Sequence, residues 1–220
     1  MKSKLFFTDA YRQIERKIAD FLNAQDEFLS GNTVRSTRAA GDAIQEILSR
    51  HFPTIVGESH CVNYSSDFAR RAMADLAFED ADRFYYVVDV KTHRTSTRFN
   101  MPNLTSVERL ARFYEDDRNY FVILYIGYDV QGLRVVVSDV KFVPIEFLDW
   151  DCLTLGALGW GQIQIANASR IVVAPRNPRK AWMLELCDAL SDFYPREIAK
   201  INDRVAYFEK VRTFWANQPD

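Results

Sequence analysis

The sequence has little glycine, proline or cysteine. Of its 220 residues, 8 are Gly, 7 are Pro and 3 are Cys. So few Gly and Pro exclude a fibrous or linker-dominated protein. Cys61, Cys152 and Cys187 are odd in number, far apart and without a CxxC pair. This pattern predicts free thiols in a reducing compartment and argues against both disulfides and a zinc site.

Long apolar runs and an excess of one charge are also absent. No stretch of about 18 apolar residues occurs, so we expect no transmembrane helix. The start, 1–9, has neither a signal-type apolar region nor a small-residue cleavage site, and a cytoplasmic protein without a membrane partner is therefore expected. Lys and Arg total 28 and Asp and Glu total 30, a net charge of −2. Any case for a nucleic-acid partner must therefore rest on local charge.

What the chain does have is apolar and aromatic residues. Hydrophobic residues make up 48% of it and aromatic residues 14%. A chain of this length buries roughly 70% of its unfolded surface, which is enough for a self-sufficient core. No break in composition divides it, and we expect one domain spanning 1–220.

Periodicity predicts the elements of this domain. Apolar spacing near 3.6 residues predicts four helices, at 8–29, 42–52 (ended by Pro53), 179–190 and 195–216, the last packing on the sheet. The run 84–91 has little polarity before its end and predicts a central strand buried on both faces. Further predictions are a helix at 104–114, a hairpin of 120–128 with 133–143, and short strands at 162–165 and 171–173.

The order of these elements predicts an α/β fold in which a central mixed β-sheet is flanked by helices. Within the single domain we expect three parts: a helical part at 1–52 with a loop at 31–41, a sheet at 53–175 and C-terminal helices at 176–220.

The candidate chemistry lies at the end of the central strand. Asp89 and Lys91 are two residues apart, so on a strand they project from one face. A turn near 79–83 would return the chain and bring Asp75 opposite Asp89. Two carboxylates near an apolar strand repel each other, and a divalent cation relieves that repulsion. Mg²⁺ prefers one or two carboxylates together with water and phosphate oxygens, and a lysine beside it can orient a water molecule.

The alternative is that Asp89 and Lys91 form a simple ion pair at a strand end, since D-x-K is a common pattern. The next segment weighs against this alternative. Residues 91–106 contain three Lys or Arg residues and no acid, and they are rich in hydroxyls and amides, which contact phosphates and base edges. The loop 31–41 is a second acid-free basic segment, with Arg35 and Arg38. The plainer interpretation of both segments is a solvated loop.

These residues resemble the PD-(D/E)xK nuclease superfamily, in particular the blunt-cutting, HincII/EcoRV-like branch of the type II restriction endonucleases. The resemblance is carried by Asp75, the run 84–92 that ends in D-V-K-T, and Pro102-Asn103 eleven residues beyond Lys91. Ala39-Ala40-Gly41-Asp42 and Gln162-Ile163-Gln164 are similar to further segments of the same group. The superfamily proline before the first acid is replaced here by Ala74.

The resemblance implies roles for particular residues. Asp75 and Asp89 would bind Mg²⁺, and Lys91 would be the catalytic lysine. A helper carboxylate would come from Glu46 or Asp42, because Gln45 stands where a Glu is expected. The DNA-binding residues would be Arg35, Arg38, His93, Arg94, Arg98, Asn100, Asn103 and Gln162.

The resulting expectation is a homodimeric, Mg²⁺-dependent type II endonuclease. It would cut both strands of a short palindromic site in double-stranded DNA and leave 5′-phosphates. The helices before the sheet would form the dimer surface. The alternatives are a structure-directed repair or mobile-element nuclease of the same fold, and a non-catalytic DNA-binding module.

Overall fold

The computed structural model describes residues 2–25, 29–31, 33–34, 36–65, 74–158 and 160–219. The chain forms two compact units, Met1–Asn177 and Pro178–Asp220. The boundary falls close to residue 176, where the C-terminal helical part is predicted to start.

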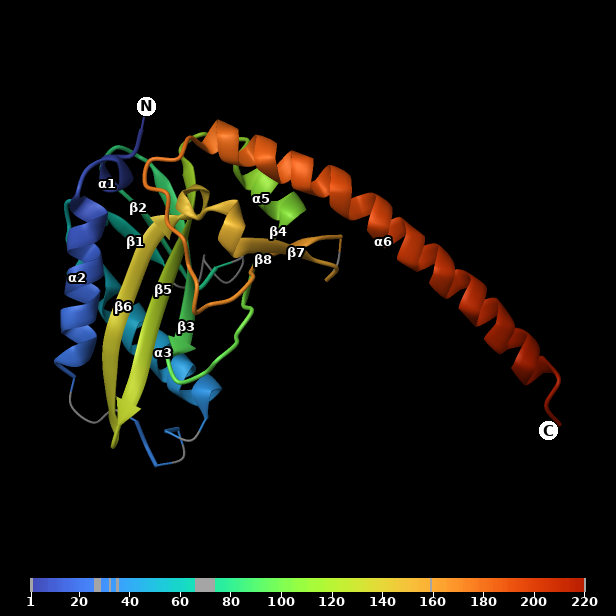
Figure 1. Cartoon of the computed structure of the whole chain (residues 1–220). Coiled ribbons are helices and arrows are strands. Elements are labelled where there is room, and N and C mark those ends of the chain that lie inside the picture. The colour runs from blue at the N-terminus through green and yellow to red at the C-terminus, as the bar shows by residue number, and fades with distance from the viewer. Residues whose placement is uncertain are drawn as a thin grey trace. The chain divides into compact units, whose positions relative to one another are not determined.

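A five-stranded mixed sheet forms the centre of the first unit (Figure 1). Its strands lie in the order β1 (Asn63–Ser65), β2 (Leu76–Glu79), β3 (Tyr85–Arg94), β5 (Asn119–Gln131) and β6 (Arg134–Pro144). β3 and β5 are parallel, and the other neighbouring pairs are antiparallel. The predicted α/β class with a mixed sheet and flanking helices is therefore confirmed.

The central strand and the hairpin agree with their predictions. β3 lies in the middle of the sheet and is buried from Tyr86 to Val90 on both faces. Its β-branched and aromatic residues suit a strand that is covered on both sides. β5 and β6 form the predicted hairpin, with Gly132 at a φ of 63° in the turn.

The N-terminal helices are α1 (Lys4–Phe7), α2 (Ala10–Asn23) and α3 (Thr37–Val56). The second ends six residues before the predicted limit of 29, and the third begins five residues before the predicted start of 42. Ser36 explains the early start of α3, because its side chain accepts a hydrogen bond from the Ala39 amide as an N-cap. Residues 37–41 are therefore helical, and the predicted loop 31–41 is shorter than expected.

Proline does not end α3 at residue 53, contrary to the prediction. Pro53 lacks the N–H that would bond to the Ser49 carbonyl one turn earlier. The Tyr64 hydroxyl donates to that carbonyl at 2.6 Å instead, so the freed acceptor is satisfied. The helix ends only at Val56, and Gly57, with a φ of 90°, is its C-cap.

Aromatic rings fill the core beneath these helices. Phe6 lies within 6.4 Å, between ring centroids, of five other rings, and Phe78 stacks on Tyr86 at 4.5 Å. Phe52 of α3 contacts Phe78 and Phe142, which joins the helix to β2 and β6. The high aromatic content thus serves one continuous core on this face of the sheet.

A smaller antiparallel sheet in the same unit has the order β4 (Asn103–Ser106), β8 (Gln162–Ile165) and β7 (Leu153–Gly156). The helix predicted at 104–114 is α5 (Val107–Phe113), because β4 occupies the first positions and Ser106 caps the helix. Two short 3-10 helices, Ile145–Phe147 and Trp150–Cys152, lie between β6 and β7. β8 matches its predicted range, and of 171–173 only Val173 forms a β-bridge, to Leu148.

The second unit contains one helix, α6 (Arg179–Ala216), where two were predicted. It continues through Pro195. The apolar side chains after Pro195 that were expected to pack on the sheet are exposed, among them Ile198 and Val205. Among the described residues, no helix is both long enough and apolar enough to cross a lipid bilayer.

Gly41 generates a testable prediction about the core. A Cβ added at Gly41 would lie 2.4 Å from Thr92 Oγ1, while the next nearest atom is 3.6 Å away. We expect Gly41→Ala to destabilise the protein by roughly 1–3 kcal/mol in urea unfolding. In a Thr92→Ala background the same change should be neutral or stabilising, because the clash is gone and Ala favours helix. Equal effects in the two backgrounds would contradict this packing.

Candidate active site

The β2–β3 hairpin brings the two predicted acids together. Leu76 pairs with Val88, and the Asp75 amide donates to the Val88 carbonyl at 2.9 Å, so Asp75 lies opposite Asp89 as predicted. The Asp75 Oδ2 atom accepts a hydrogen bond from the Val90 amide at 2.8 Å. This carboxylate is therefore fixed beside β3 at the position between Asp89 and Lys91.

Asp89 is the most constrained group of the site. It is only 5% exposed, and its Oδ1 atom accepts a hydrogen bond from Lys91 Nζ at 2.6 Å. Its other oxygen, Oδ2, is buried and has no hydrogen-bond partner among the described residues. Burial raises the pKa of Asp89 from 3.8 to about 7; Lys91 opposes this rise and the Asp75 charge adds to it.

A buried carboxylate oxygen without a partner is costly, and a cation would satisfy it. The donor set suits Mg²⁺, which binds through one or two carboxylates and completes its shell with water and phosphate oxygens. Asp75 and Asp89 would be those two carboxylates. In the described ranges, no three His, Cys, Asp or Glu side chains form a group that could hold a metal.

Neither of the two predicted helper carboxylates, Glu46 and Asp42, joins this pair. Glu46 is exposed and forms an ion pair with Arg50 in its own helix, and Asp42 is exposed. The close approach of Gly41 to Thr92 explains why these two acids lie away from the pair. Thr92 projects from the opposite face of β3 to Asp89, so α3 packs away from the acids.

Two residues predicted to bind DNA are engaged within the protein. Arg94 contacts Asp129 at 3.4 Å and donates to the Val34 carbonyl at 3.2 Å. It lies three residues beyond Lys91 and so projects from the other face of the strand. His93 is 3% exposed, and its Nε2 atom is 3.2 Å from Ser169 Oγ. Burial lowers the pKa of His93, which favours a neutral ring.

Other predicted DNA-binding residues have free or partly free side chains. Arg38 and Arg98 are exposed. Asn103 accepts a hydrogen bond from Gln164 at 2.5 Å, across β4 and β8. Arg35 lies outside the described residues.

Asn100 is linked by hydrogen bonds to β5, the strand that pairs with β3 at Lys91. Its carbonyl accepts from the Ala168 amide at 2.8 Å, and the Ala168 carbonyl accepts from the Tyr125 hydroxyl at 2.9 Å. Tyr125 is the register partner of Lys91 on β5. A short chain of hydrogen bonds thus connects the segment after β3 to the strand beside the candidate site.

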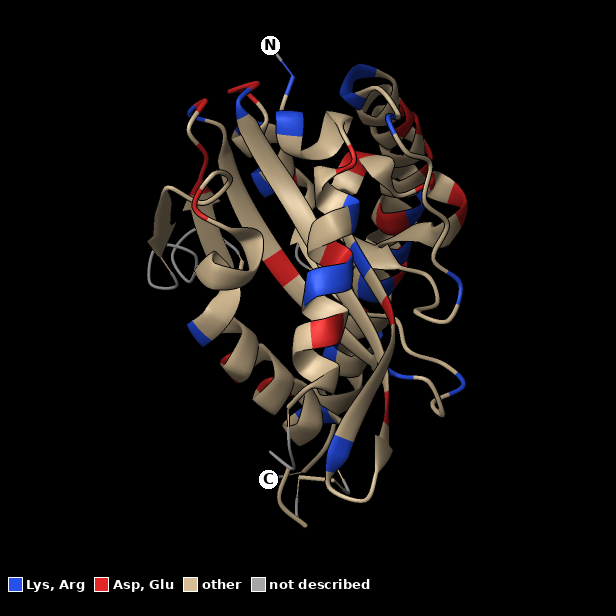
Figure 2. Cartoon of the chain, turned by 90° about the vertical axis from the view of Figure 1, so that its left-hand side faces the viewer, with Lys and Arg blue, Asp and Glu red and all other residues tan. Residues whose placement is uncertain are grey.

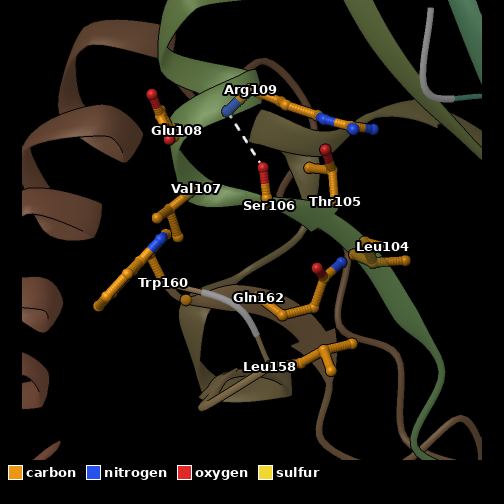
Figure 3. Close-up of a pocket in the computed structure, with 10 residues that line it drawn as sticks. Leu104, Thr105, Ser106, Val107, Glu108, Arg109, Leu158, Trp160 and Gln162 are labelled. Carbon is orange, nitrogen blue, oxygen red and sulfur yellow. Dashed lines mark hydrogen bonds between the residues drawn. The ribbon is translucent and has the colours of Figure 1, made fainter. Parts of the chain in front are cut away.

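Gln162 lines a pocket of about 400 Å³ between β4, α5 and the segment before β8 (Figure 3). Trp160 and Leu158 form part of its wall, and they are 78% and 65% exposed. Trp160 is therefore an exposed aromatic side chain beside Gln162 in this pocket.

Sequence reasoning missed a second Asp-Val-Lys, at 139–141. Lys141 pairs in register with Tyr125, which in turn pairs with Lys91, so the three side chains form a row on one face of the sheet. Lys141 contacts Asp139 at 2.5 Å. The repeated tripeptide was a visible signal, but only strand register places both copies on the same face.

The charge on the α2 side of the molecule is mixed. Acidic and basic residues alternate along α2 in Figure 2, as its sequence of Arg12, Glu15, Arg16, Lys17 and Asp20 requires. The surface of α2 therefore does not carry the single sign of charge that favours nucleic acid.

Comparison with models of known protein families and with the sequences of characterised proteins gives no match.

The buried Asp89 carboxyl generates a pH prediction. Its pKa is higher in the folded than in the unfolded protein, so the folded state holds the proton more tightly and loses stability as the pH rises from about 4 to about 7. In EDTA, the free energy of unfolding of the metal-free protein should fall by a few kcal/mol more between pH 4.5 and pH 8 than that of Asp89→Asn, because Asn cannot ionise. An unchanged difference between pH 4.5 and pH 8 would contradict the burial of this acid.

Proposed function

We propose that this protein is a Mg²⁺-dependent endonuclease acting on double-stranded DNA. The observation that supports the proposal most strongly is Asp89 Oδ2, which has no hydrogen-bond partner in the described part of the chain and is buried beside a second carboxylate and a lysine. A simple ion pair between Asp89 and Lys91 accounts for one oxygen of the acid and leaves the other unexplained.

Each residue has a distinct task in this proposal. Asp75 and Asp89 hold the cation, and the backbone amide of Val90 keeps the Asp75 carboxylate in place. When bound, Mg²⁺ supplies positive charge that stabilises the negative charge developing on the phosphodiester. Lys91 is 22% exposed at its side chain and is already aimed at the acid. Its ammonium group orients the attacking water or neutralises a phosphate oxygen.

The choice of DNA as substrate rests on the segment that leaves β3. Arg98 is exposed, Asn100 is tied by its carbonyl to the site face, and Asn103 follows on β4. Cations and amides are the groups that contact phosphates and base edges. The resemblance of the ordered motif to type II restriction endonucleases extends the proposal to a restriction-endonuclease-like fold and to cleavage of a short palindrome.

Replacement of Lys91 tests the mechanism. We expect Lys91→Ala to reduce cleavage of bacteriophage DNA by at least about 100-fold, because the amine acts in the transition state. DNA affinity in a gel-shift assay with Ca²⁺ should change little. Lys17→Ala, an exposed lysine on α2, is the matched control and should cleave normally. Normal cleavage by Lys91→Ala would refute the mechanism.

The products of the same digest separate the alternatives. Discrete bands indicate a sequence-specific enzyme, whereas cleavage confined to branched or damaged DNA indicates a repair or mobile-element nuclease. A non-catalytic module would bind DNA and leave it intact at every Mg²⁺ concentration.

Arg98 tests the proposed contact with DNA. If its guanidinium binds a phosphate, Arg98→Ala should weaken binding for all sequences and lower the slope of log K against log salt by about one. The matched control is Arg94→Ala, since Arg94 is held by Asp129 and Val34 and should leave that slope unchanged. An identical slope for wild type and Arg98→Ala would show that Arg98 does not contact a phosphate.

A further inference from the structure

The second half of α6 carries large apolar side chains that the structure leaves exposed. The exposed fractions are 57% for Ile198, 51% for Ile201, 55% for Val205, 62% for Phe208 and 67% for Trp215. Apolar residues scattered singly over a surface are ordinary, but a continuous exposed series marks an interaction site.

The spacing of these residues identifies the kind of site. Ile198, Ile201, Val205 and Phe208 follow one another at intervals of three, four and three, and Trp215 lies seven residues beyond Phe208. This is the a and d pattern of a heptad repeat, with Ile198 and Val205 at a and the other three at d. A 3.5-residue repeat favours packing of one helix along another with left-handed supercoiling.

We propose that the segment 198–215 of α6 pairs with the same segment of a second copy of this chain, as a parallel two-stranded coiled coil. The heptad seam of 198–215 is complementary to itself, since each a or d side chain fits between those of an identical helix. This pairing with a second copy of the chain does not rest on the proposed nuclease function. It also differs from the dimer surface predicted from the sequence, which was the helices before the sheet.

Charge supports the parallel orientation. Arg204 lies at a g position and Glu209 at the following e position. In a parallel pair, g of one helix meets the next e of its partner, so Arg204 would face the partner's Glu209 on both sides of the seam. Within the described residues, neither side chain has an ion-pair partner.

Arg212 occupies the next a position, between Phe208 and Trp215. One polar or charged residue at an a position costs stability and fixes the register and the number of strands. A two-stranded parallel pair keeps both Arg212 side chains at the same level, where their long stems pack and their charged ends reach water.

The area involved requires the whole seam. Phe208 and Trp215 together would remove roughly 200–300 Å² per helix from water, since a buried aromatic covers about 150–250 Å². A stable interface buries about 800 Å² on each partner. The aliphatic positions 198, 201 and 205 must therefore be buried in the interface as well.

Two adjacent aromatic residues provide the decisive variant and its control. Phe208 is 62% exposed at a d position, and Tyr207 is 61% exposed at a c position, outside the seam. We expect light scattering to give wild type twice the mass of the 25.5 kDa chain. Phe208→Asp should raise the dimer dissociation constant by at least about 100-fold, because it places two charges in the seam, whereas Tyr207→Asp should remain dimeric. A monomeric wild type, or equal effects of the two changes, would overturn the proposal.

Cysteine cross-linking tests orientation without disturbing the fold. Cys187, which is exposed, is first replaced by Ser. Ile201→Cys should then form an intermolecular disulfide on mild oxidation, since d positions face each other only in a parallel pair in register. Asp203→Cys, at an outward f position, is the control and should remain monomeric on a non-reducing gel. Cross-linking of both variants, or of neither, would contradict a parallel coil.

Discussion

The carboxylate of Asp89 lies on β3, the central strand of the sheet, which is covered on both faces. Burial of this kind disfavours the charged form of an acid. Lys91 satisfies one oxygen of Asp89, and the other has no partner among the described residues. The neighbouring Asp75 increases the cost, because its own charge opposes ionisation of Asp89. The backbone holds this arrangement in place through the β2–β3 pairing and the Val90 amide. An arrangement so unfavourable without a cation is the physical basis of the proposed metal chemistry.

Because side chains alternate along β3, its residues point to two opposite faces of the sheet. Asp89 and Lys91 share one face, together with the row that continues through Tyr125 to Lys141. Thr92 belongs to the opposite face, where Gly41 lets α3 approach closely. The same alternation turns Arg94 toward Asp129 and Val34, away from the acids.

The sequence was sufficient for the parts that depend on local pattern. The apolar run of β3, the β5–β6 hairpin and the placement of Asp75 opposite Asp89 all follow from periodicity and turn position. Helix limits were wrong where tertiary contacts decide them, as at Pro53, whose missing hydrogen bond is replaced by Tyr64. The positions of the predicted helper carboxylates and of the second Asp-Val-Lys at 139–141 depend on which face of the sheet each element packs against. Strand register determines that face, and residue spacing alone does not predict it.

The central claim is that a divalent cation occupies the space beside Asp89 Oδ2. The most direct test is anomalous diffraction from crystals of the protein soaked in Mn²⁺, which substitutes for Mg²⁺ at oxygen sites. The account predicts an anomalous peak within metal–oxygen bonding distance of both Asp89 Oδ2 and the Asp75 carboxylate, absent in Asp89→Asn. Crystals that show no such peak at saturating Mn²⁺, with Oδ2 hydrogen-bonded to a protein group or to water, would contradict it.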